Sequence, residues 1–188
     1  MFLYLMRHGA AEDTSPTGRD FERALTSAGR ATVRRVVLAL RDALPAPIDS
    51  LIASPLVRAQ ETAEIVRSLL CPGLDIEVDE ELSPDSSAYD LSVRAAASGR
   101  VTFLVGHQPN IEMVARSLAR PTFQPHAGYR PPPSSGNAPR PSLRLPPGFR
   151  TATVVGFRIE MDRRLPPYAL HVAIDPSTLS DSSPPPAS

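Results

Sequence analysis

The chain has 188 residues, of which 41% are hydrophobic and 21% charged, and its acidic and basic residues balance to a formal net charge of zero. This length suits a single domain with a sizeable core, and the neutral balance argues against a nucleic-acid-binding protein. The single cysteine, Cys71, excludes an internal disulfide and favours a reducing compartment. Because the sequence has neither a signal-peptide pattern nor an apolar run of membrane-spanning length, we expect a cytoplasmic protein with no membrane partner.

The N-terminal segment predicts a short buried strand that ends in chemically active side chains. Residues 2–6 are almost continuously apolar, as in a central strand covered on both faces. Arg7 and His8 follow where this strand would leave the sheet, and Gly9 permits a tight exit. In open α/β sheets this carboxyl edge is where ligands bind. Taken alone, the motif could equally be an ordinary exposed strand end.

A polar loop and a helix are expected next. Residues 10–24 are polar and contain Pro16 and Gly18, which predicts a loop over the same edge of the sheet. Thr26 is expected to cap the following helix, and Pro45 to end it. The apolar residues of this helix recur at helical spacing: Val33, Val36, Val37, Leu40 and Leu44.

A second strand and helix follow the same plan. Residues 50–53 predict the strand, and Ser54 and Pro55 predict the N-cap and first residue of the helix. The residues expected to be buried on this helix, or to neighbour the buried ones, are Ala59, Ala63, Val66 and Leu70. Arg58 falls in the first turn, beside that buried stripe.

Two more strands are expected before the chain changes character. Residues 75–79 alternate between polar and apolar, which predicts an edge strand, and residues 91–97 are weakly helical. Residues 101–105 predict another buried strand, and His107 stands just after it. Pro109 is expected to open a helix with these inner-face residues: Ile111, Val114, Ala115 and Leu118.

The C-terminal third combines strands with segments of low complexity. Residues 121–149 are rich in proline and offer too little apolar area to offset the entropy of ordering, so we expect a flexible insertion. Residues 153–159 and 168–172 predict two strands joined by a turn. Residues 175–188 are rich in serine and proline and predict a disordered tail. The expected organisation is therefore one domain over residues 1–174, interrupted by the insertion.

Three of the expected strands deliver basic side chains to the point where a helix begins. The first brings Arg7 and His8, the second Arg58, and the third His107. Strands linked by helices run parallel by preference, so their carboxyl ends meet at one edge of the sheet. Helix N-termini at the same edge favour an anion, and the planar fork of arginine suits two phosphate oxygens. The pattern predicts one site for a phosphate dianion.

The three junctions carry the motifs Leu5-Met6-Arg7-His8-Gly9, Ser54-Pro55-Leu56-Val57-Arg58-Ala59-Gln60-Glu61-Thr62 and Val105-Gly106-His107-Gln108-Pro109. In combination they resemble the histidine phosphatase superfamily, and most closely its SixA-type phosphohistidine phosphatase branch. The resemblance covers about residues 1–118 and resumes near residue 151. It implies an α/β fold of the phosphoglycerate mutase-like type, a three-layer α/β/α sandwich around a mostly parallel central sheet.

The resemblance also implies the chemistry of the site. It makes His8 a nucleophile that forms a covalent phosphohistidine, with Arg7, Arg58 and His107 holding the phosphoryl group. No metal or other cofactor is implied, because arginines supply the charge stabilisation that magnesium gives other phosphoryl-transfer enzymes.

The general acid that protonates the leaving group stays open at this point. Larger members of the superfamily carry a carboxylic acid after the third strand, and the candidates here are Glu81, Asp85 and Glu12. An imidazole leaving group needs less help than an alkoxide, so an undefined acid is consistent with a phosphohistidine substrate.

The leading functional hypothesis is a metal-independent phosphatase that removes phosphate from phosphohistidine in a protein partner. The first alternative is a phosphomonoesterase or mutase of the same superfamily, acting on small phosphoesters. The second is a catalytically silent phosphoprotein-binding module, which would predict loss of His8 or of an arginine. The sequence leaves the physiological substrate and the oligomeric state open.

Overall fold

A computed structural model describes residues 1–86, 100–119, 144–159 and 168–179. Six strands form one sheet in the order β3-β2-β4-β1-β5-β6. Their bounds are Phe2–Arg7 for β1, Ser50–Ala53 for β2, Ile76–Val78 for β3, Val101–Gly106 for β4, Val154–Ile159 for β5 and Tyr168–Ile174 for β6. Strands β1 to β4 pair in parallel, whereas β5 runs antiparallel to β1 and β6 antiparallel to β5. The sheet is therefore mostly parallel, as expected.

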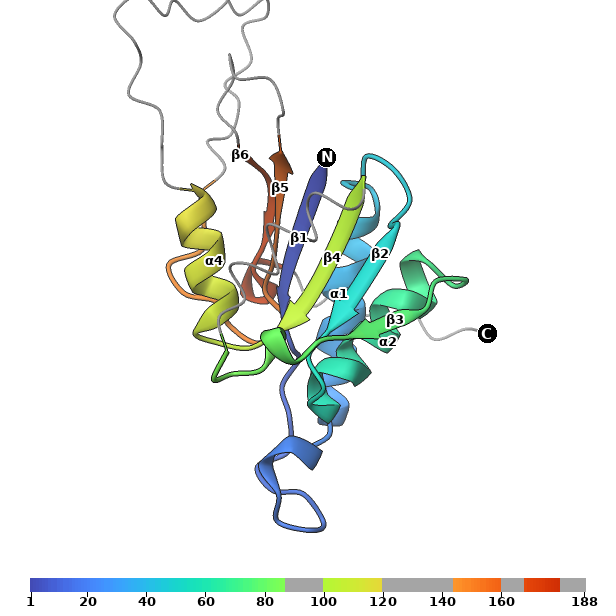
Figure 1. Cartoon of the computed structure of the whole chain (residues 1–188), viewed down its shortest axis with the longest axis vertical. Helices are drawn as coiled ribbons and strands as arrows, with labels where there is room; N and C mark the ends of the chain where they lie inside the picture. The colour runs from blue at the N-terminus through green and yellow to red at the C-terminus, as the bar shows by residue number, and fades with distance from the viewer. Residues whose placement is uncertain (87–99, 120–143, 160–167, 180–188) are drawn as a thin grey trace, which may run out of the picture.

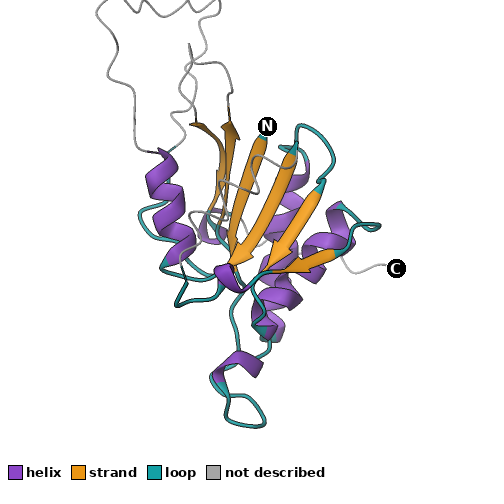
Figure 2. Ribbon diagram, in the orientation of Figure 1, coloured by secondary structure: helices purple, strands orange, loops and turns teal. Residues whose placement is uncertain are grey.

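Helices cover both faces of the sheet. Helices α1 (Ser27–Arg41) and α2 (Val57–Leu70) lie on one face, and α4 (Asn110–Ala119) lies on the other (Figures 1 and 2). Strand β1 alternates between the two cores that result. Tyr4 and Met6 pack with α1 and α2, whereas Leu3 and Leu5 pack with α4. This confirms the three-layer α/β fold, and it explains why a central strand carries no polar alternation.

Helix α1 begins and buries its residues as predicted. The Thr26 side chain accepts a hydrogen bond from the Gly29 amide at 2.8 Å, which caps the helix. Val33, Val36, Val37 and Leu40 are buried. Leu44 lies past the end of the helix and is half-buried against the same core.

The predicted start of α2 is wrong by a few residues. The helix begins at Val57 with Leu56 as its N-cap, and no side chain caps it. Ser54 is fully buried, and its hydroxyl lies against His107 and accepts from the amide of Leu56, which precedes the helix. Arg58 still lies in the first turn, as predicted, and Ala59, Ala63 and Val66 are buried whereas Leu70 is half-buried.

The end of the predicted insertion is packed rather than free. Within residues 144–149, Pro146 and Phe149 are buried. Arg116 of α4 donates to the Pro146 and Pro147 carbonyls, and Phe149 joins the core on the α4 side. The buried Phe149 ring and the hydrogen bonds from Arg116 together stabilise this end of the segment, which its proline content did not predict.

Helix α4 buries the four inner-face residues that its spacing predicted, and β3 lies at the sheet edge, as expected. Strand β6 runs to Ile174, two residues beyond the predicted end. The first residues of the predicted tail, 175–179, are also ordered. Asp175 caps a 3₁₀ helix, η3 (Pro176–Thr178), in which Pro176 is buried.

Some predictions cannot be compared with the structure. The rest of the insertion and tail and the weak helix at residues 91–97 lie outside the described residues, and the domain division stays a prediction. None of the described helices is both long and apolar enough to cross a membrane.

Candidate active site

The carboxyl ends of the parallel strands β1, β2 and β4, where the predicted site residues follow, lie side by side at one edge of the sheet. Arg7 of β1 stands opposite Gly106 of β4, and Ala53 of β2 stands opposite Val105 of β4. The side chains that follow these strands therefore share one edge. A cleft of about 580 Å³ opens there. Its lining includes all four predicted site residues: Arg7, His8, Arg58 and His107.

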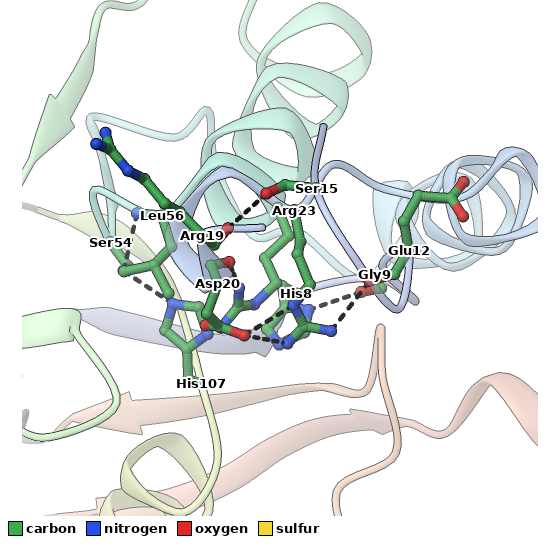
Figure 3. Close-up of polar contacts among 11 residues, drawn as sticks. His8, Gly9, Glu12, Ser15, Arg19, Asp20, Arg23, Ser54, Leu56 and His107 are labelled. Carbon is green, nitrogen blue, oxygen red and sulfur yellow. Dashed lines mark hydrogen bonds and ion pairs between the residues drawn. The ribbon is translucent and has the colours of Figure 1, made fainter. Parts of the chain in front are cut away.

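His8 is held in one tautomer by its own loop. Its Nδ1 lies 2.6 Å from the Gly9 carbonyl oxygen (Figure 3). Because a carbonyl can only accept, Nδ1 must carry the proton. In the neutral ring Nε2 therefore carries no proton, and its lone pair is available. The Gly9 amide donates to the Thr62 hydroxyl at 3.1 Å, so the segment after β1 is anchored to α2.

The surroundings of His8 keep its imidazole neutral. Its side chain is 8% exposed. Burial lowers the pKa of His8 to about 4, and the guanidiniums of Arg58 and Arg7 act in the same direction, whereas the hydrogen bond to Gly9 opposes them. At neutral pH His8 is therefore an uncharged base, as a nucleophile must be.

His107 lies against His8 but has a different partner. The two ring centroids are 4.8 Å apart. His107 Nε2 is 2.8 Å from the Ser54 hydroxyl, which also accepts from the Leu56 amide. A serine that accepts from an amide can donate its own proton to Nε2, which leaves the His107 proton on Nδ1. That Nδ1 is buried without a protein partner, and it turns toward His8 and Asp20 (Figure 3).

Burial lowers the pKa of His107 to about 3, and the proximity of His8 and Arg58 adds to the shift. A neutral His107 can donate from Nδ1 to an oxygen placed in the cleft.

The two arginines come from different elements, Arg7 from β1 and Arg58 from α2, and each donates to a backbone carbonyl. Arg7 Nη1 donates to the Phe149 carbonyl at 2.7 Å, and Arg58 Nη1 donates to the Asp20 carbonyl at 2.9 Å. The Nε atoms of both arginines are buried without a protein partner. Buried donors of this kind are rarely left unpaired, so they suit an anionic ligand.

Two charged residues of this cleft were not among the predicted site residues. Asp20, on the 3₁₀ helix η1 (Asp20–Glu22), and Arg23 both line it, from the loop that extends beyond the sheet edge in Figure 1. The loop was expected over this edge, but no periodicity marks which of its charges turn inward.

The three carboxylic acids considered as proton donor lie in different places. Asp85 lines the cleft and is exposed. Glu81 lies in the 3₁₀ helix η2 (Glu80–Leu82), and Glu12 is exposed on the loop after β1. Asp85 is thus the candidate that the fold places at the site. Among the described residues, no three His, Cys, Asp or Glu side chains are grouped so that they could hold a metal ion.

Comparison with known proteins agrees with the motifs and the fold. Residues 3–83 match the family described as the histidine phosphatase superfamily (branch 1). An uncharacterised protein of Picosynechococcus is 33% identical over 124 residues, which cover 63% of this chain and 73% of that protein. The chain belongs to the histidine phosphatase superfamily. The expectation that it is a phosphatase of this superfamily is confirmed at that level.

Solved structures of this superfamily share the fold at low sequence identity. The protein histidine phosphatase SixA in complex with tungstate has a TM-score of 0.69 and 21% identity, over 96% of this chain and 100% of that one. A SixA from Agrobacterium tumefaciens has a TM-score of 0.64 and 22% identity, over 93% and 97%. A mycobacterial glucosyl-3-phosphoglycerate phosphatase has a TM-score of 0.58 and 18% identity, over 91% and 97%.

Proposed function

We propose that this phosphatase removes phosphate from phosphohistidine in a protein, through a covalent phosphohistidine on His8. The observation that carries the proposal is the tautomer of His8. Its Nδ1 proton is donated to the Gly9 carbonyl, so the unprotonated Nε2 faces a cleft that also holds Arg7 and Arg58. A neutral nucleophile beside two fixed cations suits attack on a phosphoryl group.

The reaction proceeds in two displacements at phosphorus. In the first, His8 Nε2 forms a bond to phosphorus while the bond from phosphorus to the leaving nitrogen or oxygen breaks. In the second, water forms a bond to phosphorus while the bond from phosphorus to His8 Nε2 breaks, which releases inorganic phosphate. The proton lost by the water passes to the carboxylate that donated a proton in the first step. Arg7, Arg58 and the His107 Nδ1–H stabilise the charge on the phosphoryl oxygens in both steps. Asp85 is the proposed donor of a proton to the leaving group.

Two features support phosphohistidine over a mutase reaction. A mutase needs further basic residues to hold and reorient a second phosphate. Within the described part of the cleft, the additional cation is Arg23, and it is paired with Asp20. The likeness in fold to SixA structures points the same way.

A small phosphomonoester is the second candidate substrate. The fold is shared with a mycobacterial glucosyl-3-phosphoglycerate phosphatase, and a cleft of about 580 Å³ has room for such a molecule. A silent phosphoprotein-binding module is disfavoured, because His8, Arg7, Arg58 and His107 are all present in the cleft.

The nucleophile is tested by His8→Ala. We expect this variant to lose phosphatase turnover by at least about a thousandfold, because covalent catalysis is removed while only one small buried ring is lost. An acid-labile phosphoenzyme should be trapped in the wild type and be missing in the variant. His171→Ala is the matched control, since His171 lies on β6 and hydrogen-bonds Ala43 away from the cleft. Wild-type turnover in His8→Ala would refute the assignment.

The substrate is tested by comparing kcat/KM for a phosphohistidine-carrying protein with that for a panel of small phosphoesters. We expect the phosphoprotein to be the better substrate. A higher kcat/KM for a small phosphoester would instead establish the second candidate and leave the His8 chemistry standing.

A further inference from the structure

The guanidinium of Arg58 is already bound to an anion that belongs to the protein. Arg58 Nη2 donates to Asp20 Oδ2 at 3.0 Å, in addition to the bond from Nη1 to the Asp20 carbonyl. The Arg58 side chain is 5% exposed, whereas that of Asp20 is 64% exposed. An exposed carboxylate therefore reaches into the cleft to pair with a buried cation.

Asp20 has a second cationic partner at the rim. Arg23 donates from Nε to Asp20 Oδ1 at 2.8 Å, and its Nη2 lies 2.7 Å from the same oxygen. Arg23 is itself anchored, because its Nη1 donates to the Glu12 carbonyl at 3.0 Å. One oxygen of the Asp20 carboxylate thus binds Arg58, and the other binds Arg23. Figure 3 shows Asp20 and Arg23 beside His8.

The carboxylate and an incoming phosphoryl group require the same donors. A phosphoryl group that reaches His8 needs the terminal nitrogens of Arg58 as well as its unpaired Nε. Two anions bound to the same guanidinium repel each other, so one of them must leave it. The Asp20 carboxylate can release Arg58 and still be paired, because it keeps its ion pair with Arg23.

We propose that Asp20 is an internal competitor for the phosphate site, and that it sets which anions the phosphatase accepts. A phosphoryl dianion gains more from Arg58 and Arg7 than a single carboxylate charge does, so it displaces Asp20. A singly charged anion gains no such advantage and is rejected. When the Asp20 carboxylate binds Arg58 again after the reaction, it also weakens the binding of the phosphate product. The inference deepens the proposed function, because it takes this cleft as the phosphate site.

The experiment is titration calorimetry with inorganic phosphate at about pH 8, where the dianion predominates. Asp20→Asn should bind phosphate about tenfold more tightly than the wild type, since the competing charge is gone while the carbonyl bond to Arg58 is kept. Asp20→Ala should shift affinity in the same direction. Asp13→Asn controls for the loss of one negative charge, because Asp13 is exposed on the same loop and does not line the cleft. This control should change affinity less than threefold.

Unchanged or weaker binding in both Asp20 variants would overturn the inference, and weaker binding would make Asp20 a positioning residue for Arg58. A tenfold gain shared by the Asp13 control would also overturn it, because it would reflect net charge alone. The result is independent of turnover. If phosphate binding tightens while His8→Ala keeps full activity, the inference stands and the proposed nucleophile fails.

Discussion

His8 and His107 show how two identical side chains in one cleft are prepared for different tasks. Burial lowers the pKa of both, so both are neutral at physiological pH. Their partners then set opposite tautomers. The Gly9 carbonyl requires a proton on His8 Nδ1 and leaves Nε2 as a base, whereas the Ser54 hydroxyl can leave His107 with a donating Nδ1–H.

The lowered pKa values predict how stability depends on pH. In the folded protein the values are about 4 for His8 and about 3 for His107, against about 6.5 for an unfolded histidine. Between these limits the unfolded chain binds more protons, so acidification favours unfolding. The contribution of the two histidines to the free energy of unfolding should be fully present above about pH 6.5. It should be lost progressively as the pH falls toward about 4. Each histidine contributes up to about 1.4 kcal/mol per pH unit.

Urea unfolding at about pH 7, 6 and 5 measures this slope. The slope is proportional to the number of protons that the protein takes up on unfolding. His8→Asn and His107→Asn should each reduce that number by about one, because each removes a histidine that is protonated only in the unfolded chain. A slope that neither substitution changes would show that other groups govern the acid sensitivity.

At the scale of elements, the loop after β1 is locked to the start of α1 by close backbone contact. The Ala10 carbonyl accepts from the Thr26 amide at 2.9 Å and from the Thr26 hydroxyl at 3.3 Å. A Cβ atom at Gly29 would lie 2.1 Å from the same carbonyl oxygen. Only glycine allows this approach, which positions the cleft-lining residues of the loop.

Gly29→Ala should therefore lower the free energy of unfolding by about 1–3 kcal/mol, although alanine is the better helix former. It should also reduce phosphatase activity, since Ala10 lines the cleft and would have to move. Gly73→Ala is the matched control, because nothing lies within 4 Å of its Cβ position. That control should change stability by less than about 0.5 kcal/mol. Equal stability of the two variants in chemical denaturation would contradict the argument.

At the scale of the whole molecule, the segment that follows the proline-rich stretch joins the core to the cleft that contains Arg7 and His8. The Phe149 ring is 1% exposed in the core on the α4 side. Its amide donates to Glu112 of α4, and its carbonyl accepts from Arg7. A single residue thus contributes both to the core and to the position of the Arg7 side chain.

Phe149→Ala should lower the free energy of unfolding by about 3–5 kcal/mol, because it leaves a cavity in a packed core. Phe21→Ala removes the same ring from a side chain that is 51% exposed and should cost less than about 0.5 kcal/mol. Thermal or urea unfolding of the pair measures the difference. If Phe149→Ala were as stable as the Phe21 control, this segment would be dispensable to the core.

The helices and strands of this protein could be predicted because each has a characteristic local pattern of apolar residues. Continuous apolar runs marked β1, β2 and β4, and helical spacing marked the buried faces of α1, α2 and α4. The meeting of Arg7, His8, Arg58 and His107 also followed from sequence, because parallel strands joined by helices end at one edge.

Contacts between loops and distant segments were decided only by the tertiary structure. Asp20 reaches Arg58 across 38 positions, Ser54 reaches His107 across 53, and Phe149 reaches Arg7 across 142. None of these pairs belongs to a repeating pattern, since each depends on how irregular segments pack after the sheet has formed. The sequence alone therefore determined which strand ends and basic side chains meet at one edge of the sheet. The packing of the loops decided the hydrogen-bond partners of these side chains and brought Asp20 to Arg58.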